Sequence, residues 1–256
     1  MKKYLSAFLI IAGLLSYEAA DAQSEAIRSA RQEVIATVDK LVEIQGQNLA
    51  PEAKEREEIA LKKTTLQKII NLSVIETLDL KNKLASLAGV EAELIVLEDQ
   101  LLTKLEDYLA YFDGVREVLE VTSTREQVQK LAGDFKDWRE VSYNQELKKV
   151  VDFILVFQNK TLLKTAQERL TKFVSEIRKT KLSRGATQPL LNEAALNLRE
   201  AREANNRALN LLAPSSSAPQ TQSASLRDSV ETSLTKIKAA YKNLIDLADL
   251  VKKAAR

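Results

Sequence analysis

The sequence predicts an all-α protein, an elongated antiparallel bundle of long amphipathic helices with coiled-coil-like packing. Its 256 residues include only six Gly and four Pro, so few positions favour tight turns. Leu, Ala, Glu and Lys are abundant, and these residues lose little side-chain freedom in a helix. Apolar residues also recur every three or four positions over long stretches, which is the period of one helix face.

The first 22 residues have the features of a cleavable signal peptide. Lys2 and Lys3 form a basic start, and residues 4–15 are uncharged and mostly apolar. Small residues at Ala20 and Ala22 match the pattern cut by signal peptidase, which would leave residue 23 as the mature N-terminus. We therefore expect export to a periplasmic or extracellular space.

The alternative interpretation of this segment is an uncleaved membrane anchor. A helix needs about 20 residues to cross a bilayer core of about 30 Å, and residues 4–15 fall short of that length. No later segment has 18 consecutive apolar residues. The mature protein, residues 23–256, is therefore expected to be soluble.

Two helices are expected at the start of the mature chain. The first covers residues 24–45, where apolar residues recur at helical spacing. The second covers residues 52–88. Pro51 fits its first turn, because no helical partner is needed there for the missing N–H, and Gly89 is the expected stop.

Residues 90–119 give the clearest helical signal. Nine of their apolar residues follow one another at steps of three or four positions: Val90, Leu94, Leu97, Leu101, Leu105, Tyr108, Phe112, Val115 and Leu119. The mean spacing is close to the roughly 3.6 residues of a helical turn, so one apolar stripe on a straight helix is predicted. Gly114 lies inside this pattern and is expected to be tolerated.

Thr124 and Gln127 have the spacing of a capping box, so another helix should begin directly after Thr124. Its apolar pattern includes Val141, and a bend is expected near Tyr143. The helical pattern then continues almost to Gly185, which is the expected C-terminal cap.

Two further helices and one linker complete the prediction. Thr187 should cap the first of these helices, with Pro189 in its first turn. Residues 214–224, rich in Ser, Pro and Gln, should form a flexible linker. The last helix, residues 225–256, should begin with Ser225 as its cap. The expected organisation is a signal peptide (1–22), a helical bundle (23–213), the linker and this last helix.

Two segments carry opposite charge. Residues 90–120 contain nine acidic and two basic residues, a net charge of −7, and residues 160–184 contain eight basic and two acidic residues, a net charge of +6. One interpretation is that these are outward faces of neighbouring helices, whose opposite charges favour packing side by side. The other is that the basic segment is an interaction face for anionic lipid or an acidic envelope polymer. This candidate face consists of Lys160, Lys164, Arg169, Lys172, Arg178, Lys179, Lys181 and Arg184.

The sequence contains no His and no Cys. This excludes thiol catalysis, Ser-His-Asp triads and His- or Cys-based zinc sites, so we expect no catalytic residue, no metal and no cofactor. A carboxylate-based hydrolase remains as an enzymatic alternative, although no pair of acidic residues has a distinctive context. The net charge of +2 gives no reason to expect a nucleic-acid partner.

Six aromatic residues are expected to cluster where the helix over 90–119 meets the one that follows it. Packing in the core is the first interpretation, and a ligand pocket at the same place is the alternative. The six are Tyr108, Tyr111, Phe112, Phe135, Trp138 and Tyr143.

Together these features predict an exported, non-enzymatic helical scaffold or partner-binding protein of the cell envelope. We expect a protein partner, which the sequence does not identify. The alternative is a membrane-active or lipid-binding protein, in which residues 150–184 would open and lie on a bilayer. A homo-oligomer is a further expectation, because the linker would let the last helix pair between chains.

Overall fold

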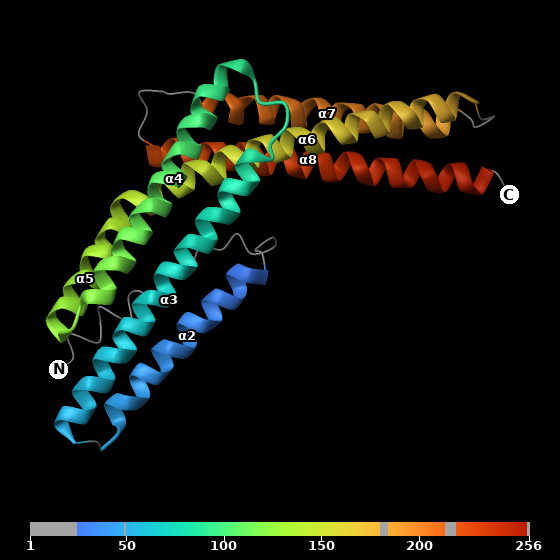
Figure 1. Ribbon diagram of the computed structural model, residues 1–256. Helices are drawn as coiled ribbons and strands as arrows, with labels where there is room; N and C mark the ends of the chain where they lie inside the picture. The colour runs from blue at the N-terminus through green and yellow to red at the C-terminus, as the bar shows by residue number, and fades with distance from the viewer. Residues whose placement is uncertain (1–24, 49, 180–183, 213–218, 255–256) are drawn as a thin grey trace. The chain divides into compact units, whose positions relative to one another are not determined.

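A computed structural model of the chain describes residues 25–48, 50–179, 184–212 and 219–254. The signal-like segment therefore lies outside the described residues. The described part consists of α-helices and one π-helical turn, without a strand, so the predicted all-α class is confirmed (Figure 1). The elements are α2 (Glu25–Gly46), α3 (Pro51–Ala85), α4 (Ala92–Val121), α5 (Arg125–Trp138), the π-helix η1 (Arg139–Tyr143), α6 (Asn144–Lys179), α7 (Arg184–Leu212) and α8 (Pro219–Ala254).

The chain divides into two compact units. Unit 1 comprises Met1–Ser86 and Val96–Lys148, and unit 2 comprises Leu87–Ile95 and Lys149–Arg256. The boundaries thus fall directly after α3, inside α4 and near the start of α6. Because the last helix belongs to unit 2 together with α6 and α7, this division differs from the predicted single bundle followed by a separate helix.

Unit 1 is an antiparallel arrangement of α2, α3, α4 and α5. Ion pairs join α2 to α3 at Arg31–Glu76 and α3 to α4 at Lys81–Glu106. Its core contains residues from each of these helices and from η1, including the C-terminal part of the predicted stripe of α4, from Tyr108 to Leu119. The buried members are Ile27, Ala30, Val34, Leu66, Ile69, Ile70, Leu72, Tyr108, Phe112, Val115, Leu119, Ala132, Phe135 and Tyr143.

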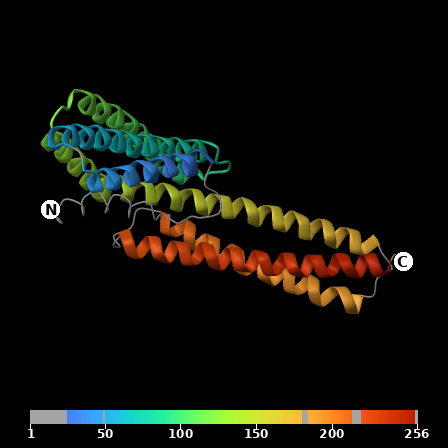
Figure 2. The same cartoon turned by 90° about the horizontal axis from the view of Figure 1, so that it is seen from below.

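Unit 2 is built around α6, α7 and α8, which lie alongside one another (Figure 2). Apolar clusters occur in sequence along the bundle, and each cluster takes residues from all three helices. The order of these residues makes α8 parallel to α6 and antiparallel to α7. The clusters are Val156, Ala208, Leu226 and Val230; then Leu163, Ala166, Leu198, Ala201, Ile237 and Ala240; then Ile177, Ala194, Leu244 and Leu247.

Several local predictions are confirmed. Pro51 occupies the first turn of α3. Both hydrogen bonds of the capping box form, from the Gln127 N–H to Thr124 Oγ1 and from the Thr124 N–H to Gln127 Oε1. Helix α3 ends at Ala85, earlier than expected, and Gly89 follows in the connection with a positive φ of 74°.

Other predictions are wrong at the helix ends. Gly185 is not a C-terminal cap, because α7 already begins at Arg184 and includes it. Thr187 and Pro189 therefore lie inside α7 rather than at its start. Pro189 is the sixth residue of α7, so it lacks the N–H that would bond to the Gly185 carbonyl in a regular helix.

The last helix also begins earlier than predicted. Helix α8 starts at Pro219, so the second half of the expected linker is helical and Ser225 is an interior residue. The remaining linker residues, 214–218, lie outside the described part. Tertiary contacts account for the longer helix, because Ser223 and Arg227 both bond to Asp152 of α6.

Candidate functional site

The six predicted aromatic side chains come together in unit 1. Tyr111 stacks on Trp138 with ring centroids 3.9 Å apart, and Tyr108 meets the edge of Trp138 at 5.4 Å. Phe112 and Tyr143 are fully buried, whereas Tyr111 and Trp138 are half-buried. The predicted cluster is thereby confirmed as part of the core of unit 1.

The π-helical turn η1 directs two polar side chains into this core. Phe135, Arg139, Tyr143 and Leu147 follow one another at steps of four residues, and each such step advances about 40° around an α-helix. In a regular α-helix, repeated steps of four residues would therefore rotate these side chains away from the core. A π-helical turn contains more residues than an α-helical turn and cancels this rotation, so Arg139 and Tyr143 both remain on the buried side. The expected bend near Tyr143 is thus a π-helical turn in a continuous helical segment, and Val141 points outward instead of into the core.

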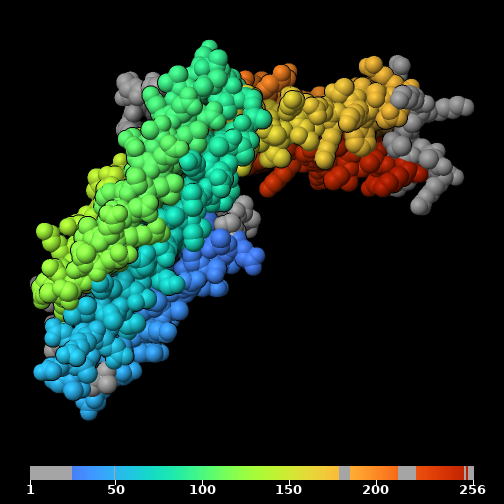
Figure 3. Space-filling model, viewed as in Figure 1, coloured from blue at the N-terminus to red at the C-terminus, as the bar shows by residue number. Residues whose placement is uncertain are grey.

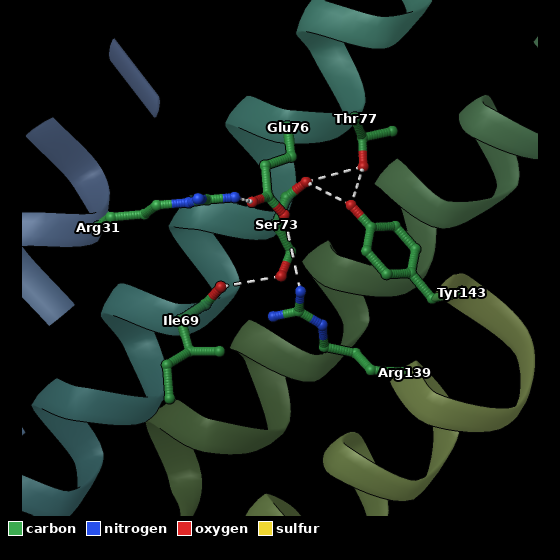
Figure 4. Close-up of polar contacts among 7 residues, drawn as sticks. All are labelled: Arg31, Ile69, Ser73, Glu76, Thr77, Arg139 and Tyr143. Atoms are coloured by element: carbon green, nitrogen blue, oxygen red, sulfur yellow. Dashed lines mark hydrogen bonds and ion pairs between the residues drawn. The ribbon is translucent and has the colours of Figure 1, made fainter. Parts of the chain in front are cut away.

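Arg139 and Arg31 bind the same carboxylate (Figure 4). Arg31 Nη2 lies 3.1 Å from Glu76 Oε1, and Arg139 Nη2 lies 3.6 Å from Glu76 Oε2. The guanidinium of Arg139 also lies 5.3 Å from the centre of the Tyr143 ring. Two cations therefore share one anion in a largely buried position that joins α2, α3 and η1.

A second set of contacts adjoins this ion pair network. The Tyr143 hydroxyl donates to the Ser73 carbonyl at 3.0 Å and lies 2.8 Å from Thr77 Oγ1. Thr77 Oγ1 donates to the same carbonyl at 2.7 Å. Figure 4 shows these side chains next to Arg139 and Glu76. We call the seven residues drawn there the polar cluster of unit 1: Arg31, Ile69, Ser73, Glu76, Thr77, Arg139 and Tyr143.

Burial keeps the phenols of this region protonated. It raises the pKa of Tyr143 far above the usual value, and the nearby carboxylate of Glu76 raises it further. Burial, with the carboxylates of Glu146 and Asp107, raises the pKa of Tyr108 to about 12. The Tyr143 hydroxyl therefore stays a hydrogen-bond donor even above about pH 10, where an exposed phenol would ionise.

The charged members of the polar cluster were not predicted from the sequence. Arg31, Glu76 and Arg139 look like ordinary surface charges in helices rich in such residues. The usable signal was the run of four-residue steps around Arg139, because a helix with that spacing either loses its buried face or contains an irregular turn.

The predicted basic face is spread around the outward part of α6. Lys164, Lys172 and Arg178 are exposed, and no ion pair to a described residue engages them. Arg169 lies over the Tyr241 ring at 5.2 Å. Lys160 is held by the Gly89 carbonyl and by the carboxylate of Glu91. The backbones of Lys179 and Arg184 lie in α6 and α7, and Lys181 lies outside the described residues.

One ion pair among the described residues joins the acidic and basic segments, that between Glu91 and Lys160. Other acidic residues of the segment pair within unit 1: Glu106 with Lys81, Asp107 with Lys104, and Asp113 with Arg116. Beyond the Glu91 contact, the predicted side-by-side pairing of the two segments stays a prediction.

Unit 2 also contains buried polar contacts between helices. Asp152 of α6 accepts hydrogen bonds from Ser223 and from Arg227 of α8, the latter at 2.8 Å. Asn159 Nδ2 of α6 donates to Asn205 Oδ1 of α7 at 2.8 Å, and both residues are almost fully buried. These contacts join the three helices at fixed heights, as buried polar pairs do when they specify helix register.

Among the described residues, no group of three or more acidic side chains is arranged to hold a metal ion. None of the helices in the described ranges combines the length and apolar character needed to cross a bilayer. Comparisons with protein-family models, curated proteins and solved structures found no match to this chain.

Proposed function

We propose that this protein is an exported, non-enzymatic scaffold or partner-binding protein of the cell envelope. The observation that supports the proposal is how its charged groups are used. Arg139 and Asp152 are buried, Glu76 is largely buried, and all three are engaged in contacts between helices of their own unit. The outward side of α6 instead presents Lys164 and Lys172 to the surroundings. Internal charges thus serve architecture, and the surface is where a partner would bind.

The export part of the proposal rests on residues 1–22 of the sequence. Fractionation of cells that produce the full chain, followed by N-terminal sequencing, tests it directly. We expect a soluble envelope protein that begins at Gln23. A chain that keeps residues 1–22 and stays with the membrane would support the anchor, and recovery in the cytoplasm would contradict export.

The partner-binding part is tested with the mature protein, residues 23–256, as crosslinking bait in its own envelope fraction. The comparison is with a charge-reversed α6, Lys164→Glu, Lys172→Glu and Arg178→Glu. A matched control reverses three exposed lysines elsewhere and changes the net charge equally: Lys130→Glu, Lys238→Glu and Lys242→Glu. Partners that both variants still capture would not depend on α6. Partners lost only with the α6 variant would support its outward side as the binding surface.

A lipid-binding protein is the second candidate, and the exposed cations of α6 favour it. The apolar part of α6, residues 150–157, is largely buried, so we expect peripheral attraction to anionic headgroups rather than insertion. Co-sedimentation with vesicles, with and without anionic lipid, discriminates the two candidates. Absence of binding to anionic vesicles at low salt would remove the lipid hypothesis.

A further inference from the structure

Three cations on the outward side of α6 are free for a partner. Lys164, Lys172 and Arg178 are exposed and make no ion pair with the residues that the structure describes. Their neighbours in the same segment differ, since Lys160 is bound by Glu91 and Arg169 lies over Tyr241. A binding partner of α6 would therefore meet these three positions first.

The spacing of the three cations defines what such a partner must offer. Lys164 and Lys172 are eight residues apart, and Lys172 and Arg178 are six residues apart. On a helix with a rise of about 1.5 Å per residue, this places the cations about 12 Å and about 9 Å apart along the axis. A complementary helix would carry carboxylates at similar heights.

The outward side of α4 carries carboxylates with the same spacing. Asp99, Asp107 and Asp113 are also eight and six residues apart, and all three are exposed. Asp107 and Asp113 pair with Lys104 at 3.3 Å and with Arg116 at 2.8 Å, each within one turn of α4. Such exposed pairs are weak and exchange readily. Figure 3 shows α4, in green, with one side uncovered by other helices.

We propose that the outward side of α6 in one copy of this protein binds the outward side of α4 in a second copy. The proposal rests on the scaffold function above and names the partner of its basic surface. Charge complementarity and equal spacing are its basis. The two surfaces differ, so a contact between two copies leaves the α4 surface of the first copy and the α6 surface of the second copy unoccupied. Further copies can bind there. The association is therefore head-to-tail and forms an open chain or a ring.

The association should be weak and sensitive to salt, because it depends on exposed charges. Sedimentation velocity of the mature protein, residues 23–256, over a range of concentrations tests this. At about 0.01 M salt, where charges act over about 30 Å, the mean mass should rise with concentration. At about 1 M salt, where the range is about 3 Å, the protein should be monomeric. A monomer at every concentration in low salt would overturn the proposal.

Two charge-reversed variants identify the surfaces. One carries Lys164→Glu, Lys172→Glu and Arg178→Glu, and the other carries Asp99→Lys, Asp107→Lys and Asp113→Lys. Each alone should associate at least about tenfold more weakly than the parent, because like charges then face each other. An equimolar mixture should associate again, since every contact then joins opposite charges. The control is the variant with Lys130→Glu, Lys238→Glu and Lys242→Glu, which should associate as the parent does.

A mixture that stays monomeric would overturn the pairing of α6 with α4. Circular dichroism of each variant checks that the helices are retained, which we expect because all six positions are exposed. If the protein does not self-associate, the crosslinking experiment still tests whether α6 binds another envelope protein. The two proposals can therefore fail separately.

Discussion

Tyr143 and Thr77 are 66 residues apart in the chain, yet their hydroxyl oxygens lie 2.8 Å apart in the core of unit 1. Both hydroxyls also contact the Ser73 carbonyl. Two hydroxyl hydrogens thus serve three short contacts, all of them buried. The contact fixes η1 against α3, and it exists because the π-helical turn keeps Tyr143 on the buried side.

Removal of the Tyr143 hydroxyl tests the value of this contact. In Tyr143→Phe the ring still fills the core, and Thr77 still donates to the Ser73 carbonyl. We therefore expect the free energy of unfolding to fall by about 1 kcal/mol, the usual net value of one hydrogen bond. Urea denaturation followed by the fluorescence of Trp138 measures it. The control is Tyr111→Phe, whose half-buried hydroxyl makes no hydrogen bond to a described residue, and an equal loss there would contradict the assignment.

The raised pKa of Tyr143 predicts how this difference changes with pH. Above about pH 10 the unfolded chain releases the phenolic proton, while the folded chain retains it. The unfolded state is then favoured, so the parent should lose stability relative to Tyr143→Phe, with a slope that approaches about 1.4 kcal/mol per pH unit above about pH 10. Denaturation of both proteins between about pH 9 and pH 11 checks this. A difference that stays constant with pH would show that the phenol ionises normally.

Glu76 should be the most sensitive charge of unit 1. Glu76→Gln leaves the guanidinium groups of Arg31 and Arg139 without their shared carboxylate, and the side chain of Arg139 is only 8% exposed. We expect a loss of about 3 kcal/mol in the free energy of unfolding, as when one partner of a buried pair is removed. Glu106→Gln breaks an exposed pair with Lys81 and should cost at most about 1 kcal/mol. Similar losses in both variants would contradict the buried role of Glu76.

The regular parts of this fold could be predicted from the sequence because helical periodicity and capping are local signals. The stripe of α4 and the capping box at Thr124 are examples, and the six aromatic residues were placed together correctly for the same reason. The start of α8 was missed because Ser and Gln favour a linker by composition, whereas contacts with Asp152, 71 and 75 residues away, support a helix.

The charged part of the polar cluster was missed for a different reason. A buried Arg and an exposed Arg look alike in a sequence, and only the packing of α2, α3 and η1 brings Arg31 and Arg139 to Glu76. The basic face shows the converse. The density of basic residues in the sequence indicates this face, but only the structure separates Lys160, which is bound to Glu91, from Lys164, which is free of ion pairs to the described residues.

The Asn159–Asn205 contact should be energetically coupled, because both amides are buried between apolar clusters of unit 2. Asn159→Ala and Asn205→Ala each leave the other amide without its partner, at a cost of about 1–3 kcal/mol. The double variant should lose at least about 0.5 kcal/mol less than the sum of the two single losses. Urea denaturation of all four proteins of this cycle measures the coupling. The exposed contact between Gln188 and Asn192 provides a control cycle, in which the two single losses in the free energy of unfolding should add. Additive losses at Asn159 and Asn205 as well would contradict the assignment.

Two glycines should respond in opposite directions to the same substitution. Gly114 lies inside α4, about two turns before its C-terminal end, is exposed, and has open space where a Cβ would be placed. Gly114→Ala should therefore raise the free energy of unfolding by about 0.5–1 kcal/mol, because alanine loses less backbone freedom in a helix.

Gly89 also has open space around it, but its φ of 74° disfavours any residue with a Cβ, so Gly89→Ala should be destabilising. Thermal unfolding of the two variants separates steric crowding from backbone strain. A Cβ would meet open space at both positions, and only Gly89 has a positive φ. A gain at Gly89 would mean that the connection between α3 and α4 adopts another conformation, and a loss at Gly114 would mean that its outward surface is covered by a neighbour.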